Sequence, residues 1–224
     1  MRPPVEAALR VTPMPAKPAS SRIRNAKPPQ PPTKAPRARP AVTKSRPASS
    51  PVWVFGYGSL MWNPGFPFRV REAALTRGWH RAFCVYSHVW RGTPERPGLV
   101  LGLDRGGSCR GIAFAIDPKD EADVLAYLDE RERVTNVYVR KRLAVDLATG
   151  GTVRAWSYVA DRAHPQYAGK LAPEHAATLI AHGVGRGGPN PEYLENTIQH
   201  LDQLGIPEGP LHRLRDRVRR LALP

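Results

Sequence analysis

The chain has 224 residues, a formal net charge of +15 and only two cysteines. Two cysteines without a Cys-x-x-Cys pair are too few for a disulfide framework or a structural zinc site. No apolar run is long enough for a signal peptide or a membrane span, so we expect a soluble, intracellular protein.

Residues 1–51 form a basic, proline-rich tail without aromatic residues. Residues 1–50 hold eleven of the 34 Lys and Arg residues, one acidic residue and twelve of the 25 prolines. Such a segment cannot bury enough apolar surface to offset the entropy lost on ordering, so we predict a disordered tail and one domain at 52–224. Three interpretations stay open: a solvated extension or an upstream start codon, a transit peptide, and a segment that binds nucleic acid. The first is favoured.

The domain opens with an apolar, aromatic run at 52–55 that is typical of a buried strand. It then breaks into Gly56-Tyr57-Gly58-Ser59. Glycine lets a ligand approach the main chain, and consecutive N–H groups at the end of a strand can converge on an anionic oxygen. An ordinary turn with structural glycines is an equally good interpretation. The spacing of a phosphate-binding loop is missing.

Further elements follow in chain order. We predict a strand at 80–87, then a hairpin of 99–103 and 111–116 with its turn at 105–107. A helix should begin after Asp117-Pro118 and run to residue 133, because acidic residues occupy its first turn. Strands at 138–147 and 152–159 and helices at 173–182, 191–204 and 209–221 complete the domain. Strands first and helices last indicate an α+β fold with an antiparallel sheet or small barrel.

Candidate chemistry gathers where the first helix ends, at Asp129-Glu130-Arg131-Glu132. Most charges on such a helix face water. A carboxylate buried there beside tyrosines would have a raised pKa and could act as a general base near neutral pH. The residues alone do not decide between Glu130 and Glu132.

Other kinds of site are disfavoured. Ser59 does not lie in a Gly-x-Ser-x-Gly elbow, and Cys84 lies within a predicted strand, which is typical of a buried thiol. The seven histidines show no spacing of metal ligands, so we predict no metal site.

Several motifs, in the same order, resemble the ChaC-like γ-glutamylcyclotransferases, which act on glutathione. The resemblance covers residues 52–223 and excludes the tail. Its motifs are Phe-Gly-Tyr-Gly-Ser-Leu-Met-Trp-Asn-Pro at 55–64, Gly-Trp-His-Arg-Ala-Phe-Cys at 78–84, Arg-Gly-Thr at 91–93, Gly-Ile-Ala-Phe at 111–114, Arg131-Glu132 with Tyr138 six residues on, His-Pro-Gln-Tyr at 164–167 and Asn-Pro-Glu-Tyr-Leu at 190–194.

This resemblance implies a small mixed β-barrel flanked by helices, in the cytoplasm. It also implies a lyase-type reaction in which the α-amine of a γ-glutamyl group attacks its own γ-amide carbonyl. Ring closure gives 5-oxoproline and, from glutathione, releases Cys-Gly. One carboxylate can serve as base and then as acid, and because the attack is intramolecular the enzyme mainly has to fold its substrate. No cofactor or metal is required.

The resemblance assigns roles to particular residues. Glu132 becomes the acid/base, and Glu130 has none. The substrate-binding segment corresponds to Gly56, Tyr57, Gly58, Ser59, Leu60 and Met61, whose main-chain N–H groups would meet the γ-glutamyl moiety. Tyr57 and Tyr138 would line the pocket. Arg81 would face the substrate carboxylates or serve a structural role.

The chain departs from the family's pattern at two places. Leu99 follows Pro97-Gly98 where family members carry arginine, and the glycine often found after the catalytic glutamate is missing from 133–137. The loss of the arginine puts strict glutathione specificity in question. The alternatives are a cyclotransferase for other γ-glutamyl amines or peptides, and a non-catalytic γ-glutamyl-binding domain.

Overall fold

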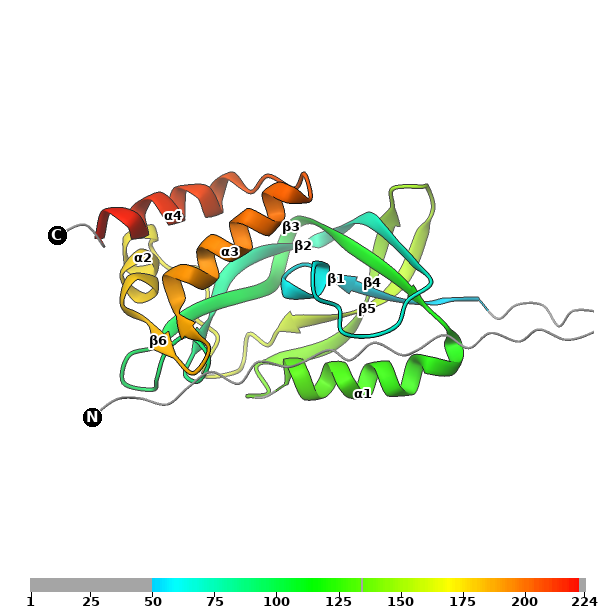
Figure 1. Cartoon of the computed structure of the whole chain (residues 1–224), viewed down its shortest axis with the longest axis horizontal. Helices are drawn as coiled ribbons and strands as arrows, with labels where there is room; N and C mark the ends of the chain where they lie inside the picture. Colours follow the sequence, from blue (N-terminus) through cyan, green and yellow to red (C-terminus); the bar gives the residue numbers. More distant parts are fainter. Residues whose placement is uncertain (1–49, 134, 222–224) are drawn as a thin grey trace, which may run out of the picture. The chain divides into compact units, whose positions relative to one another are not determined.

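A computed structural model describes residues 50–133 and 135–221 (Figure 1). Residues 1–49 of the tail, for which disorder is predicted, lie outside these ranges. Five strands form a closed barrel in the order β1-β3-β2-β4-β5. Their bounds are β1 Val52–Gly56, β2 Val70–Ser87, β3 Gly98–Ile116, β4 Tyr138–Leu147 and β5 Thr152–Ala160. β1 and β5 pair in parallel and the other neighbours are antiparallel, so the predicted mixed barrel is confirmed.

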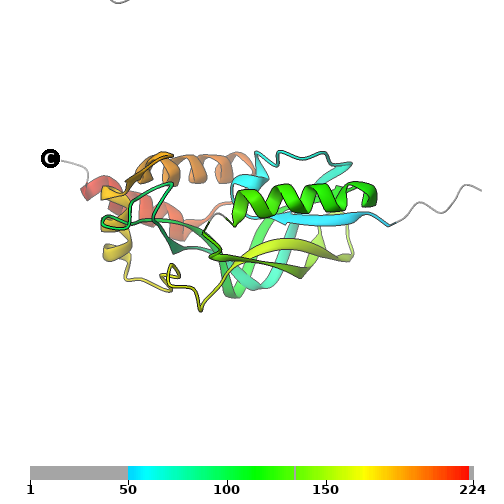
Figure 2. The same cartoon turned by 90° about the horizontal axis from the view of Figure 1, so that it is seen from below.

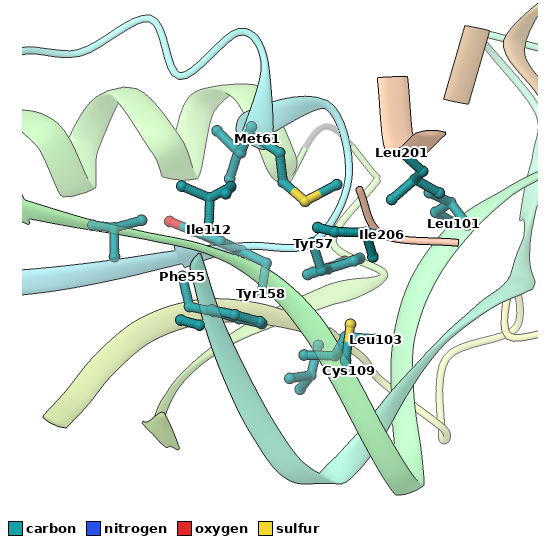
Figure 3. Packing of buried hydrophobic residues seen from close by; sticks show 14 of the residues in the cluster. Phe55, Tyr57, Met61, Leu101, Leu103, Cys109, Ile112, Tyr158, Leu201 and Ile206 are labelled. Atoms are coloured by element: carbon teal, nitrogen blue, oxygen red, sulfur yellow. The ribbon is translucent and has the colours of Figure 1, made fainter. Parts of the chain in front are cut away.

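The predicted hairpin at 99–116 is wrong. These residues form one long strand, β3, which pairs with β2 along its length. Gly106 and Gly107 do adopt positive φ, as a turn would require. They lie within the strand, however, opposite Gly78 of β2, where a bulge shifts the register between the two strands. A two-residue turn and a bulge both draw on glycine at positive φ, so the local sequence did not separate them. β2 also begins earlier than predicted, and both strands bend together (Figure 3).

Four α-helices flank the barrel: α1 Glu121–Glu132, α2 Pro173–His182, α3 Asn190–Gln203 and α4 Gly209–Leu221. These bounds agree with the predicted helices to within two residues. Two short 3-10 helices, η1 Ser59–Met61 and η2 Pro118–Asp120, and a pair of two-residue strands, β6 Val184–Gly185 and β7 Gly188–Pro189, complete the described part. α2, α3 and α4 pack together at one end, whereas α1 lies alone beside the barrel (Figures 1 and 2).

One face of α1 is apolar and buried: Val124, Leu125 and Leu128 pack inward. Val124 and Leu128 join a continuous core that fills the barrel and extends under α2, α3 and α4. Figure 3 shows Phe55, Tyr57 and Met61 pointing into this core. The core therefore fixes the turn after β1 and the end of α1, the two segments singled out by the sequence. None of the described helices is both long and apolar enough to cross a membrane.

Candidate active site

A cavity of about 420 Å³ lies where several chain segments meet. Its volume is within the range of small-molecule sites. Three of the predicted residues line it, namely Glu132 at the end of α1, Ser59 in the turn after β1 and Tyr138 at the start of β4. The end of β2, residue 166 and one face of α3 supply further lining residues. The cavity therefore brings together both segments that the sequence marked for chemistry.

The structure separates the two glutamates that the sequence left open. Glu132 lines the cavity with 20% of its side chain exposed, whereas Glu130 is exposed to solvent and does not line it. Burial raises the pKa of Glu132, and the nearby Arg131 offsets part of this rise. A raised pKa brings a carboxyl group closer to the range in which it can accept and then donate a proton.

Tyrosines surround the buried carboxyl group. Tyr138 donates a hydrogen bond to the Leu101 carbonyl (2.6 Å), and the Leu101 N–H donates to the Tyr193 hydroxyl (3.4 Å). Burial raises the pKa of Tyr57 and Tyr138 far above 10, and that of Tyr193 to about 12. These hydroxyl groups therefore stay neutral, and they leave Glu132 in a weakly polar environment.

The turn after β1 lies behind the cavity wall. Ser59 lines the cavity, while Gly56, Tyr57, Gly58, Leu60 and Met61 lie outside the lining. A Cβ atom at position 56 would come within 3.0 Å of the Leu60 Cβ atom, so Gly56 serves the turn itself. No described residue accepts a hydrogen bond from the N–H groups of residues 58, 59 and 60. Of these donors at the start of η1, the N–H group of Ser59 belongs to a residue that lines the cavity and can meet a ligand there.

Arg81 is buried beneath this turn and does not line the cavity. Its guanidinium donates to the carbonyls of Tyr57 (2.5 Å) and Arg110 (2.6 Å) and pairs with Glu208. These contacts support the structural alternative, and contact with substrate carboxylates stays a prediction. Leu99 also lies outside the lining; its side chain is fully buried.

Arg131 is a site residue that sequence reasoning left on the solvated face of a helix. Its Nε lies 3.2 Å from Glu132 Oε1, and its Nη2 donates to Ser59 Oγ (2.9 Å). Its Nη1 donates to the carbonyl of Asn63 (2.7 Å) and to the Tyr127 hydroxyl (3.2 Å). The signal that could have identified it is its place in the Arg-Glu pair of the family motif.

Two other residues of the family motifs, Gln166 and Arg91, also line the cavity. Gln166 donates to the Tyr86 carbonyl (3.0 Å), and Arg91 places its guanidinium carbon 5.3 Å from the Tyr193 ring centre. Thr197 Oγ1 is buried without a hydrogen-bond partner among the described residues, which is typical of a group that meets a ligand or water. Thr197 shares one face of α3 with the other residues of that helix that line the cavity. Helical spacing predicts that these residues share a face, but it does not predict which part of the protein that face meets. The lining contributed by α3 is Tyr193, Asn196, Thr197 and His200.

Comparisons with known proteins agree with this architecture. The family described as ChaC-like protein matches residues 52–221. The glutathione-specific γ-glutamylcyclotransferase of Escherichia coli K12 is 38% identical over 181 residues, which cover 81% of this chain and 78% of that protein. The glutathione-specific γ-glutamylcyclotransferase 1 of Danio rerio is 36% identical over 151 residues, covering 65% and 76%.

Structural similarity supports the fold. The crystal structure of the yeast γ-glutamyl cyclotransferase specific to glutathione has a TM-score of 0.69 and 24% identity, and the match covers 76% of this chain and 96% of that one. The resemblance stated from the sequence is thus confirmed. The chain belongs to the ChaC-like family of γ-glutamylcyclotransferases.

Proposed function

We propose that this protein is a glutathione-specific γ-glutamylcyclotransferase that converts glutathione into 5-oxoproline and Cys-Gly. The observation that carries the proposal is Glu132, a buried carboxylate in a cavity of about 420 Å³ beside the turn after β1. The names of the E. coli and Danio rerio relatives support glutathione as the substrate.

Glu132 is proposed to move the protons of the reaction. Its carboxylate takes a proton from the α-ammonium group, and the freed nitrogen attacks the γ-carbonyl carbon and forms the new C–N bond. The oxyanion would be stabilised by the N–H group of Ser59, which lines the cavity and has no acceptor among the described residues. As the intermediate collapses, the original amide C–N bond breaks and the leaving nitrogen takes the proton back from Glu132. The carboxylate then takes the second proton that the ring nitrogen must lose and passes it to the leaving amine, so that Cys-Gly departs as an ammonium and Glu132 is ionised again.

The other site residues are proposed to hold the substrate. Ser59 and Tyr138 line the cavity and would contact it directly, whereas Gly56, Tyr57, Gly58, Leu60 and Met61 would set the shape of the turn. Arg91 adds a guanidinium to the lining, which suits the carboxylates of a γ-glutamyl peptide. Folding the substrate into its reactive conformation is the larger part of catalysis for an intramolecular attack.

A cytoplasmic location is part of the proposal. Both cysteines are free and buried, which suits a reducing compartment. We also propose that the chain consists of a tail at 1–51 and a domain at 52–224.

Nucleic-acid binding by the tail is an alternative function. Salt-dependent retention of the full chain on nucleic acid would test it, with residues 50–224 as the control.

The test is the release of 5-oxoproline and Cys-Gly from glutathione by the full chain. Glu132→Gln keeps the shape of the side chain and removes the base. Glu130→Gln is the matched control, because it makes the same change two residues away on an exposed position. We expect the wild type and the Glu130 variant to release both products at similar rates, and the Glu132 variant to lose this activity.

Two other outcomes would change the proposal. If the wild type cyclises another γ-glutamyl amine but not glutathione, the chemistry stands and the substrate is corrected. If no γ-glutamyl compound reacts but glutathione analogues bind, the protein is a γ-glutamyl-binding domain.

A further inference from the structure

We propose that Arg131 is a positioning residue, which holds Glu132 and the turn after β1 in one arrangement so that both meet the same substrate. This inference rests on the proposed function, because it concerns the delivery of the acid/base to the γ-glutamyl group.

The geometry of the guanidinium group carries the proposal. One edge pairs with the Glu132 carboxylate through Nε at 3.2 Å. Nη2 donates to Ser59 Oγ (2.9 Å), although the two residues are 72 positions apart in the sequence. Nη1 donates to the Asn63 carbonyl at 2.7 Å, which fixes the far end of the same turn. A single side chain thus connects the two segments that line the candidate active site.

Arginine is suited to this task and lysine is not. The guanidinium group is planar and presents five N–H donors in a fixed fork, so it can meet several acceptors in set directions. A lysine ammonium at this position could pair with Glu132 but could not also reach Ser59 and Asn63 in the same geometry. Replacement of Arg131 by lysine therefore removes the fork of N–H donors and keeps the positive charge, whereas replacement by methionine removes both.

The charge of Arg131 acts on the same carboxylate. Among the described residues, Arg131 is the one cation within ion-pair distance of Glu132. It favours the ionised form and opposes the effect of burial on the pKa of Glu132. Removing this cation should raise that pKa further, so activity should need a higher pH.

Arg133 provides a matched control two positions along the chain. Its side chain is 47% exposed and lies 4.0 Å from Asp129, on the same turn of α1. It makes no hydrogen bond or ion pair with Glu132 or with the turn after β1. Replacement of Arg133 removes the same charge from the same helix end without touching the proposed contacts.

The experiment compares Arg131→Met, Arg131→Lys and Arg133→Met in the full chain, with glutathione as substrate. For Arg131→Met we expect kcat to fall by about 10²-fold, as for a misplaced reacting group, and the acidic limb of the pH profile to move to higher pH. Arg131→Lys should restore the acidic limb while kcat stays low. Arg133→Met should match the wild type in both, and thermal melting checks that all variants are folded.

Three results would overturn the inference. An acidic limb that does not move in Arg131→Met would show that Arg131 does not act on Glu132. Full recovery of kcat by Arg131→Lys would show that the fork is not needed. Activity lost only in proportion to unfolded protein would leave a purely structural role.

The proposed function is tested apart from this inference. A wild type that releases no 5-oxoproline would overturn the function. The pKa of Glu132 can still be measured by ¹³C NMR in the wild type and in Arg131→Met, and equal values would overturn the Arg131 contact by themselves.

Discussion

Two carboxylates that line cavities in this protein, the partly exposed Glu132 and the buried Asp104, have pKa values shifted in opposite directions. The Asp104 side chain is 9% exposed and lies on β3, in a second cavity of about 710 Å³. Burial alone would raise the pKa of Asp104, but hydrogen bonds from Arg162 (2.7 Å), Tyr167 (2.8 Å) and the Arg105 N–H (2.8 Å) outweigh it and lower the pKa. Glu132 pairs only with Arg131 among the described residues, and its pKa is raised.

Burial favours a raised pKa in both carboxylates, and the number of hydrogen-bond donors decides whether it is offset. Asp104 lies in the larger cavity, yet its oxygens are satisfied, so it holds its negative charge firmly and is a poor proton carrier. Glu132 lies in the smaller cavity with few partners, and its raised pKa makes it the better candidate for a proton carrier. The comparison therefore supports the proposed acid/base role of Glu132 and favours a structural role for Asp104.

The largest expected effect separates the two residues by activity. Each carboxylate is changed to its amide. Glu132→Gln should lower kcat by about 10²- to 10⁴-fold, which is the usual contribution of an acid/base. Asp104→Asn should change kcat by less than about threefold, because the second cavity shares no lining residue with the first. Steady-state release of 5-oxoproline measures both. Equal losses in the two variants would break the comparison.

The next effect separates them by stability. Asp104→Asn leaves Arg162 without its anionic partner, which should lower the free energy of unfolding by about 1–3 kcal/mol. Glu132→Gln removes a poorly compensated buried charge and should not lower it. Urea unfolding at pH 7 gives both values. A destabilised Glu132 variant would mean that its ion pair with Arg131 is worth more than its burial.

The pH dependence of stability should have opposite signs. The lowered pKa of Asp104 contributes stability that is present above its unfolded pKa and is lost as pH falls through the folded value. The raised pKa of Glu132 makes the wild type lose stability as pH rises from the unfolded towards the folded value. Between pH 3 and pH 8, the free energy of unfolding of Asp104→Asn should therefore decrease relative to the wild type. That of Glu132→Gln should increase relative to the wild type. Parallel curves in urea titrations would contradict this.

The smallest effect sharpens the role of one donor. Tyr167→Phe removes a single hydrogen bond to Asp104 and should lower the free energy of unfolding by about 1 kcal/mol. Kinetic constants should stay at the wild-type level, because Tyr167 does not line the first cavity. A changed KM for glutathione would instead connect the two cavities.

Local patterns predicted most elements of this fold. The helix and strand periods gave α1 to α4 and β4 and β5 with close bounds, because each is a continuous amphipathic or apolar segment. The same reasoning placed a hairpin inside β3, since the partner of Gly106 and Gly107 lies on β2 and is absent from the local sequence. Closure of the barrel through the parallel β1–β5 pair likewise depends on contacts distant in sequence.

The site was predictable in part. Composition alone left Glu130 and Glu132 undecided, and the family motif chose Glu132. Burial of its side chain follows from where α1 ends against the barrel, which the sequence does not show. Arg131 was missed for the same reason: its acceptor Ser59 is 72 residues away.

The short β1 strand has a consequence for where a substrate can bind. β1 pairs with β3 only from Ile112 to Ile116, so at Leu99 and Leu101 the edge of β3 that faces away from β2 pairs with no strand. Side chains take the place of that strand: Asn190 exchanges two hydrogen bonds with Leu99 (2.7 and 2.8 Å), and two tyrosines serve Leu101. A sheet edge normally has to be protected from other chains. Here Tyr138 and Tyr193, which cover this edge, also line the cavity, so the proposed binding site lies against the unpaired edge of β3.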